Sequence, residues 1–226
     1  MKPDSAGKLI LVATPIGNLE DMSPRAQEVL STADVVMAED TRRTGRFVPD
    51  RKRLYSCHDH NIQGRLPQIK QFLLQGATVA MASDAGTPGV SDPAYRAVGL
   101  AVEIGAEVTM IPGPSAVIMA LVVSGLPTDR FAFEGFLPFK KGRRRRRIEQ
   151  MVGYTGTVVY YVGPHHLSSV LEALLSVFGD RRCCVARELT KLHEEIVRGT
   201  LSGLLEKYTS AAPRGEITLV VEGASG

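Results

Sequence analysis

A loop rich in glycine and proline carries the strongest sign of chemistry in this sequence. It spans residues 83–93, reads SDAGTPGVSDP, and follows the short apolar run 77–82. Glycine lets a backbone approach a ligand closely, and Asp84 can accept hydrogen bonds from a ribose or an ammonium group. Asp92 and Pro93 alone would explain a helix start, but such a start does not require residues 84–87. We therefore predict that this loop binds a ligand.

A second loop of similar character reads PGPSA at residues 112–116. It follows the apolar run 107–111 and opens an apolar helix expected over 116–123. The free amides at a helix N-terminus can receive an anion or another polar ligand atom. Simple N-capping by Ser115 explains the same residues equally well, so both interpretations stay open.

Positive charge is concentrated in two segments, although the formal net charge of the 226 residues is only +3. The segment 140–147 contains five consecutive arginines, which are repelled from a core, and we predict that it is a loop in solvent or against an anion. The alternative to nucleic-acid binding is a plain solvated surface, but two separate basic loops favour RNA phosphates. The two segments are Lys140, Lys141, Arg143, Arg144, Arg145, Arg146 and Arg147, and Arg42, Arg43, Arg46, Arg51, Lys52 and Arg53.

The sequence lacks the motifs that would indicate a dinucleotide-binding enzyme, a P-loop NTPase or a zincin protease. No G-x-G-x-x-G follows the first apolar run, and neither a P-loop nor an H-E-x-x-H motif is present. The segment Cys57-His58-Asp59-His60 lacks zinc-motif spacing, so we interpret it as a loop lining the substrate cleft and expect no metal. We interpret His165-His166 as a helix start.

The three cysteines favour a reducing compartment, because an odd, low count argues against a disulfide framework. We find no apolar stretch long enough to span a membrane and no signal-peptide pattern, and therefore expect a cytoplasmic protein.

Apolar runs and helical patterns alternate through the first half of the chain. We expect strands over 8–13, 34–38, 77–82 and 107–111, with helices from Pro24, over 64–74, and from Pro93 to about Ile104. Such alternation predicts an α/β domain whose mostly parallel sheet is covered by helices on both faces. Ligands bind such sheets at the carboxyl ends of the strands, which is where loops 14–18, 83–93 and 112–116 lie.

The pattern changes after Gly125-Leu126-Pro127, where we place a domain boundary. Residues 1–126 form the predicted N-terminal domain and residues 127–226 the predicted C-terminal domain. In the second we expect strands over 131–137, 157–162, 182–187 and 216–221, with helices over 167–177 and 201–208.

Seven short motifs, in order along residues 8–223, resemble those of the tetrapyrrole methylase superfamily. They are TPIGN (14–18), AEDTR (38–42), DAGTPGVSDP (84–93), PGPSA (112–116), RELTK (187–191), HEE (193–195) and GEI (215–217). Within the superfamily they are similar to the branch that methylates the 2′-oxygen of a cytidine in 16S ribosomal RNA. The resemblance implies two α/β domains, the second with a mixed sheet. It also implies S-adenosylmethionine folded between the domains, and a homodimer that acts on ribosomal RNA or on the small ribosomal subunit.

The same resemblance assigns cofactor contacts by motif. In the first domain they are Pro15, Asp84, Gly86, Thr87, Ser115 and Ala116. In the second, the region of Val162, Leu189, Gly215, Glu216 and Ile217 would close over the cofactor.

Two departures from the family pattern affect these assignments. The family usually has an E-S-P-H-R-like stretch where this chain reads Val162-Gly163-Pro164-His165-His166, so a role for that stretch does not carry over. Many members also continue with a small helical segment, and we expect no RNA contact of that kind within these 226 residues.

Methyl transfer from a sulfonium is an in-line displacement that needs alignment and a group to receive the proton, but no metal. A ribose hydroxyl is a weak acid, so a polarising or deprotonating group is expected. The candidates are Lys191, Glu188 and Asp40, with His58 and Arg42 also considered. A lysine with a depressed pKa could be the base, and Arg42 could orient a phosphate. Structural ion pairs would explain Glu188, Lys191 and Asp40 equally well.

Two alternatives to an RNA ribose methyltransferase remain. An enzyme of the same fold could methylate a tetrapyrrole or a protein, or the chain could be an RNA-binding factor without catalysis. The two separated basic segments favour RNA, for which we predict contacts by Arg42, Arg43, Arg143, Arg144, Arg145, Arg146 and Arg147.

Overall fold

Short apolar runs in the first half of the chain form a parallel sheet. The computed structural model describes residues 6–50, 53–210 and 213–225. The sheet has the order β3-β2-β4-β1-β5, and every neighbouring pair is parallel. Its strands are β1 (Lys8–Val12), β2 (Val35–Ala38), β3 (Leu54–Ser56), β4 (Thr78–Ala82) and β5 (Glu107–Ile111). The continuous apolar character of β1, β2 and β4 follows from burial on both faces.

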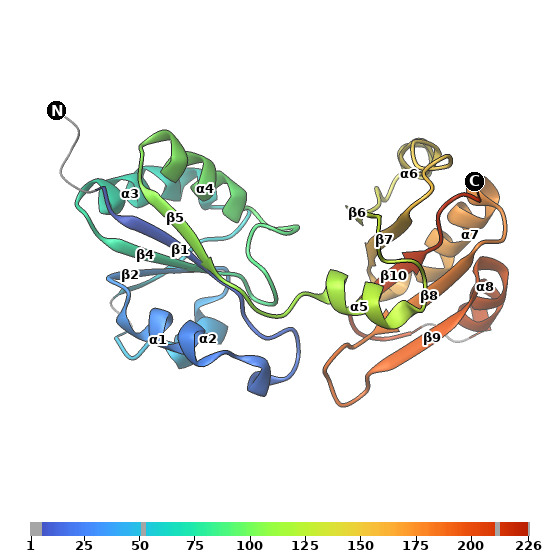
Figure 1. Cartoon of the computed structure of the whole chain (residues 1–226), viewed down its shortest axis with the longest axis horizontal. Helices are drawn as coiled ribbons and strands as arrows, with labels where there is room; N and C mark the ends of the chain where they lie inside the picture. Colours follow the sequence, from blue (N-terminus) through green and yellow to red (C-terminus); the bar gives the residue numbers. More distant parts are fainter. Residues whose placement is uncertain (1–5, 51–52, 211–212, 226) are drawn as a thin grey trace. The chain divides into compact units, whose positions relative to one another are not determined.

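Helices cover both faces of this sheet, as predicted. In Figure 1, α3 (Ile62–Leu74) and α4 (Ala94–Glu103) lie on one face, with α1 (Pro24–Thr32) and the short α2 (Thr41–Thr44) on the other. Ser23 caps α1 by accepting a hydrogen bond from the amide of Ala26 at 3.1 Å, and Pro24 occupies the first helical turn. Two 3-10 helices, η1 (Leu19–Asp21) and η2 (Gly45–Phe47), lie in the connections.

The second half of the chain forms a mixed sheet in the order β6-β7-β10-β8-β9. Only β6 and β7 pair in parallel, and the other neighbours are antiparallel. The strands are β6 (Phe131–Phe136), β7 (Thr157–Val162), β8 (Arg182–Arg187), β9 (Glu195–Thr200) and β10 (Ile217–Val221). The predicted fold class is confirmed for both sheets.

The two faces of the second sheet carry different helices. Apolar side chains of α6 (Lys141–Glu149), α7 (Leu167–Phe178) and α8 (Leu201–Ser210) share one core with alternate residues of β7, β8 and β10. The remaining helix, α5 (Ala116–Ser124), packs against the other face (Figure 1). The short η4 (Pro164–His166) leads into α7, as expected for His165-His166.

The chain divides into two compact units between Ser115 and Ala116, whereas the sequence places a boundary near residue 127. The difference arises because α5 packs with the second sheet. Its last carbonyls, of Val123 and Ser124, accept hydrogen bonds from the Arg198 guanidinium of β9. Helix α5 is apolar and follows β5 directly, so the sequence does not indicate which of the two sheets it packs against.

Four elements differ from the sequence predictions. Strands β3 and β9 and helix α2 were not predicted, because β3 and α2 are very short and β9 is a partly exposed edge strand with polar residues. The prediction of a basic loop is also wrong, because the five arginines lie on helix α6. A helix separates consecutive charges around its axis and so reduces their repulsion.

The three cysteines are buried and free. Burial raises the pKa of the Cys57 thiol to about 11 and that of Cys183 to about 12, so both thiols are protonated near neutral pH. Among the described residues, no helix combines the length and apolar character needed to cross a membrane.

Candidate functional site

The carboxyl ends of β1 and β4 mark the topological switch point of the first sheet. These strands are neighbours, yet the chain leaves β1 towards α1 on one face and leaves β4 towards α4 on the other. Parallel α/β sheets bind ligands where such connections diverge. The predicted loops 14–18 and 83–93 follow these two strands, and loop 112–116 follows the adjacent β5.

Hydrogen bonds tie the three loops together. Thr14 and Gly86 exchange backbone hydrogen bonds of 3.0 Å each, and the Thr14 hydroxyl donates to the Ser83 carbonyl at 3.1 Å. The Thr87 hydroxyl donates to the Pro114 carbonyl at 3.2 Å. Gly86 has a φ of +78°, and a Cβ there would lie 3.2 Å from Ile16. The glycine therefore serves a left-handed turn inside a tight junction.

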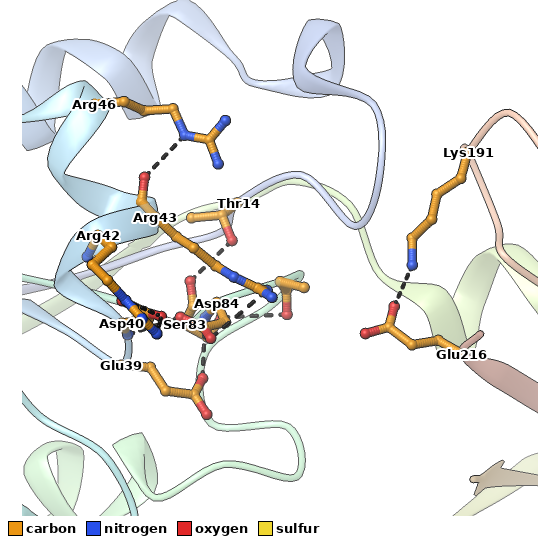
Figure 2. A network of polar contacts seen from close by, with 11 residues as sticks. Thr14, Glu39, Asp40, Arg42, Arg43, Arg46, Ser83, Asp84, Lys191 and Glu216 are labelled. Carbon is orange, nitrogen blue, oxygen red and sulfur yellow. Dashed lines mark hydrogen bonds and ion pairs between the residues drawn. The ribbon is translucent and has the colours of Figure 1, made fainter. Parts of the chain in front are cut away.

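Two acidic motifs meet at this edge, as Figure 2 shows. Asp84 accepts a hydrogen bond from the Asp40 amide at 2.8 Å and lies 3.8 Å from the Arg43 guanidinium. The Glu39 carboxylate in turn accepts from the Asp84 amide at 3.0 Å. The AEDTR and DAGTP motifs are thus one hydrogen-bonded structure. Part of the role of Asp84 is to hold it together.

Glu39 is a site residue that the sequence analysis missed. Burial raises its pKa, and the nearby Asp84 carboxylate adds to this, although the hydrogen bond from the Asp84 amide opposes it. The available signal was its position, because it directly follows a fully buried strand and precedes Asp40. A carboxylate at a parallel strand end faces the site edge.

Asp40 acts as a helix cap. Its carboxylate accepts from the Arg42 amide at 2.8 Å, and the exposed Arg42 guanidinium binds both of its oxygens. Hydrogen bonds from the Arg42 side chain and backbone hold the Asp40 pKa far below its usual range. So acidic a carboxyl group is a weak base. The contacts match the ion-pair alternative and leave little driving force for proton abstraction by Asp40.

The predicted contacts Ser115 and Ala116 stand at the division of the chain. Ser115 is the last residue of the first unit and Ala116 opens α5 in the second. Pro15 lies beside Thr14 on the first loop and is half-buried. Asp84, Gly86 and Thr87 lie on the interlocked loop described above, so the structure brings the first-unit candidates to one edge of one sheet.

In the second unit, Lys191 lies between two carboxylates. Its Nζ atom is 2.9 Å from Oε1 of Glu188 and 2.9 Å from Oε2 of Glu216 (Figure 2 shows the second pair). The same Glu188 oxygen accepts a hydrogen bond from the Glu216 amide at 2.9 Å. We refer to these three residues as the carboxylate–lysine cluster. Through it the RELTK and GEI motifs contact each other in this unit.

The protonation of the cluster follows from these contacts. Burial lowers the pKa of Lys191, but the hydrogen bonds that its ammonium group donates to both carboxylates outweigh this effect, and the net pKa is raised. The hydrogen bond from Lys191 lowers the pKa of Glu188, against a smaller opposing effect of burial. Lys191 is therefore a cation near neutral pH, contrary to the depressed pKa that a lysine base requires.

The backbone at the cluster is strained. Glu188 and Thr190 have φ values of 51° and 64°, in the left-handed region that β-branched residues such as threonine rarely adopt. Leu189 between them is buried, and Ile217, which pairs with both Arg187 and Val162, belongs to the core. Such strain persists only where surrounding contacts hold it, and it concentrates at functional sites.

Gly215 makes room for the cluster, and its replacement by alanine should destabilise the second unit. A Cβ at Gly215 would lie 2.3 Å from the Glu188 carboxylate, on a backbone with φ of +86°. We expect Gly215→Ala to lower the unfolding free energy by about 2–4 kcal/mol, from the left-handed backbone and the displaced carboxylate. Gly105→Ala is the control, because Gly105, at the end of α4, has a φ of +74° with open space around it. Equal melting temperatures for the two variants would contradict the packing argument.

The predicted basic contacts differ strongly in exposure. Arg144 is only 7% exposed, so the prediction that the whole run lies in solvent or against an anion is wrong for this residue. Arg145 pairs with Glu149 and Arg147 with Glu134. Arg143 and Arg146 are exposed, and the described residues offer neither an ion-pair partner. In the first unit, Arg42 and Arg43 are exposed, while Arg51 and Lys52 lie outside the described residues.

The Cys57–His60 segment connects β3 to α3 and is held by its own contacts. Asn61 accepts a hydrogen bond from the His58 amide at 2.8 Å, and its side-chain amide lies 3.3 Å from the His58 ring. Within the described ranges, no three histidine, cysteine or acidic side chains are grouped so as to hold a metal ion.

Comparison with known proteins agrees with this architecture. Residues 8–205 match the family model of the Tetrapyrrole (Corrin/Porphyrin) Methylases. The chain is 46% identical over 223 residues to Ribosomal RNA small subunit methyltransferase I of Synechocystis, covering 97% of this chain and 80% of that protein. It is 43% identical to the protein of the same name from Thermotoga maritima, covering 96% of this chain and 99% of the relative.

Solved structures share the fold at low sequence identity. Uroporphyrin-III C-methyltransferase of Thermus thermophilus, in complex with S-adenosylhomocysteine, superimposes with a TM-score of 0.66 at 20% identity, covering 96% of this chain and 97% of that one. A conserved hypothetical protein from Aeropyrum pernix gives 0.75 at 19% identity, covering 98% and 86%. With the interlocked loops, the carboxylate–lysine cluster and the family match over most of its length, the chain belongs to the tetrapyrrole methylase family and is a methyltransferase.

Proposed function

We propose that this protein transfers a methyl group from S-adenosylmethionine to the 2′-oxygen of a cytidine ribose in 16S ribosomal RNA. The observation that carries the proposal is the 46% identity, over nearly the whole chain, to a ribosomal RNA small subunit methyltransferase. The exposed arginines of α6 are consistent with an RNA substrate, because they can contact phosphate groups.

The residues at the first-unit edge fit the methyl donor. S-adenosylmethionine carries ribose hydroxyls, an ammonium group and a carboxylate, which require a mixture of acceptors and donors. Asp84 supplies a partly exposed carboxylate, and the glycine-rich loop supplies main-chain groups that a ligand can approach closely. When bound, the donor provides an electrophilic methyl group. The chain must bind it, orient it and exclude water.

Lys191 is the residue that we assign to the acceptor oxygen. An ammonium group has three donors, and the two carboxylates of the cluster occupy two of them. The remaining donor of this part-exposed side chain can stabilise the negative charge that develops on a ribose oxygen as its proton leaves. Because Lys191 is already protonated, it polarises the hydroxyl instead of abstracting its proton, and the proton leaves to bulk solvent at this part-exposed site.

Methyl incorporation tests the proposal directly. Purified protein would be mixed with labelled S-adenosylmethionine and small ribosomal subunits from cells that lack this activity. We expect one methyl group per subunit, on a ribose 2′-oxygen of a cytidine, located by nuclease digestion and mass spectrometry. Label on a base, or label only when a tetrapyrrole or protein is supplied, would overturn it.

We also propose a cytoplasmic homodimer. Size-exclusion chromatography with light scattering should give a mass near twice the 24.4 kDa of the chain. A mass of one chain at micromolar concentration would contradict the dimer and leave the proposed reaction untouched.

A further inference from the structure

The second unit contains a pocket to which the residues assigned to the cofactor contribute only Val162. Its volume is about 280 Å³, and it lies between the end of β6, the end of β7 and the start of α7. Aromatic and apolar side chains line most of it: Phe136, Pro138, Phe139, Tyr161, His166 and Val170. We call it the aromatic pocket.

The rings around the pocket are arranged in pairs with open faces. The rings of Phe136 and Tyr161 have centroids 5.5 Å apart, and those of Phe139 and His166 are 5.0 Å apart. Phe136 is 65% exposed and Phe139 is 76% exposed, which is unusual for a side chain of this size. Phe133 packs edge-on against Tyr161 and fixes it in place. Exposed aromatic pairs beside a pocket mark a surface that binds a flat apolar group.

The basic helix begins at the rim of the same pocket. Arg144 donates hydrogen bonds to the Pro138 and Phe139 carbonyls at 3.2 and 3.0 Å, which holds the rim segment against α6. Arg143 and Arg146 lie on the same helix, exposed and without ion-pair partners among the described residues. Aromatic faces beside unpaired guanidinium groups suit a base with phosphates on either side.

We infer that the aromatic pocket receives one unstacked base of single-stranded RNA, while Arg143 and Arg146 contact the flanking phosphates. This inference rests on the proposed function and extends it to the substrate-binding site. A volume of about 280 Å³ lies at the low end of the range for small-molecule sites. It accommodates a single base, whereas a macrocycle would need more space.

The position of the pocket supports this assignment. Val162, which lines it, pairs with Ile217 of β10, and Ile217 pairs with Arg187 of β8. Glu216 and Glu188 directly adjoin these last two residues. The pocket and the carboxylate–lysine cluster therefore stand on neighbouring strand ends of one sheet. Enzymes that modify one nucleotide must take it out of its stack and hold it beside the reacting groups.

The adenine of the methyl donor is the competing occupant, because it has the same flat aromatic chemistry. The donor carries no phosphate, however, and so leaves the unpaired arginines of α6 without a function. The positive charge on this helix, which begins beside the pocket, favours RNA.

The test uses the full-length protein and a short single-stranded RNA containing one fluorescent cytidine analogue that is quenched by stacking. We expect quenching on binding. Phe139→Ala and Phe136→Ala should each weaken affinity about 5- to 150-fold and remove the quenching. Phe139→Tyr, which keeps the ring, should stay within about twofold. The matched control is Phe131→Ala, on the same strand and exposed but outside the pocket.

Two further measurements separate the possible outcomes. Calorimetry with S-adenosylhomocysteine should give the same affinity for Phe139→Ala as for the unaltered protein, and a loss confined to this ligand would assign the pocket to adenine and overturn the inference. Unchanged RNA affinity and quenching in both alanine variants, with normal methylation of small subunits, would sink the inference and leave the proposed function standing. Normal quenching without any methylation of subunits would do the reverse.

Discussion

Replacing Lys191 by methionine should reduce methyl transfer to small ribosomal subunits about 100- to 1,000-fold in kcat, with a much smaller effect on the affinity for S-adenosylhomocysteine. Methionine keeps the apolar length of the side chain but removes the cation between Glu188 and Glu216. The magnitude is that of losing one preorganised donor to a developing oxyanion. Single-turnover kinetics with labelled donor would measure it.

Lys207→Met is the matched control for this substitution. Lys207 also pairs with a glutamate, Glu195 at 3.1 Å, but it lies on α8 and is not part of the carboxylate–lysine cluster. We expect its activity to stay within about twofold of the unaltered protein, because an exposed ion pair contributes little. If Lys191→Met were as active as this control, Lys191 would have no part in the reaction.

The pH dependence distinguishes a polarising lysine from a lysine base. The pKa of Lys191 is raised above its ordinary value, so its stabilising contacts are complete at lower pH and are lost only as the pH rises through that raised value. The pKa of Glu188 is lowered, so its contribution is present above its unfolded pKa and is lost as the pH falls through the folded one. Between about pH 6 and 9 both groups keep their charge. In that interval the pH profile of kcat should have the same shape in the unaltered protein and in Lys191→Met. A lysine base would instead give the unaltered protein an ionisation that Lys191→Met lacks.

The sequence predicted the parallel sheet well because burial on both faces leaves a clear record. The strands β1, β4 and β5 are uninterrupted apolar or mixed runs that end at glycine- and proline-rich loops, and the carboxyl ends of adjacent parallel strands must meet. The junction of Thr14, Gly86 and Pro114 follows from that topology. The sequence predicted the three loops, but which of them interlock follows from the strand order β4-β1-β5, which the structure supplies.

Other features depend on contacts that local sequence does not record. Helix α5 belongs to the second unit, where the Val123 carbonyl at its end accepts a hydrogen bond from Arg198, more than 70 positions further along the chain. The edge strand β9, with the sequence EIVRGT, has neither clean alternation nor a continuous apolar run, and none of its residues is fully buried. Glu39 was passed over in favour of Asp40, because which of two adjacent acids is buried depends on where the strand ends.

The protonation state of Lys191 could not be predicted from the sequence pattern, because it depends on the charges around the side chain. A lysine near two glutamates has a raised pKa, whereas the same lysine in an apolar pocket has a lowered one. RELTK alone does not reveal that Glu216, 25 residues later, lies 2.9 Å from Lys191. Only the fold supplies the second carboxylate, and it reverses the expected direction of the shift.

Arg144→Ala should destabilise the second unit by about 2–4 kcal/mol, although four neighbouring arginines resemble it in sequence. Its guanidinium group donates to the carbonyls of Pro138, Phe139 and Ser169 and to the Ser169 hydroxyl, at 2.8–3.2 Å. Because Arg144 is only 7% exposed, its removal leaves part-buried carbonyls without their donor and opens a cavity beside α7. Calorimetry should show a melting temperature lower by about 5–15 °C. Arg144→Lys should recover only part of the loss, because one ammonium group cannot reach three separated carbonyls.

Arg146→Ala separates this structural role from the electrostatic one on the same helix. Arg146 is exposed and unpaired among the described residues, so its loss should change the unfolding free energy by less than about 0.5 kcal/mol. It should instead weaken RNA binding at every sequence and lower the slope of log affinity against log salt by about one. If Arg144→Ala and Arg146→Ala gave equal melting temperatures, the buried network would not be the reason that one arginine of the run lies in the core. If the two variants differed in stability but both kept the salt slope of the unaltered protein, the exposed face of α6 would make no phosphate contact. Arg144, which holds the rim of the aromatic pocket, would then be the one arginine of residues 143–147 with an explained role.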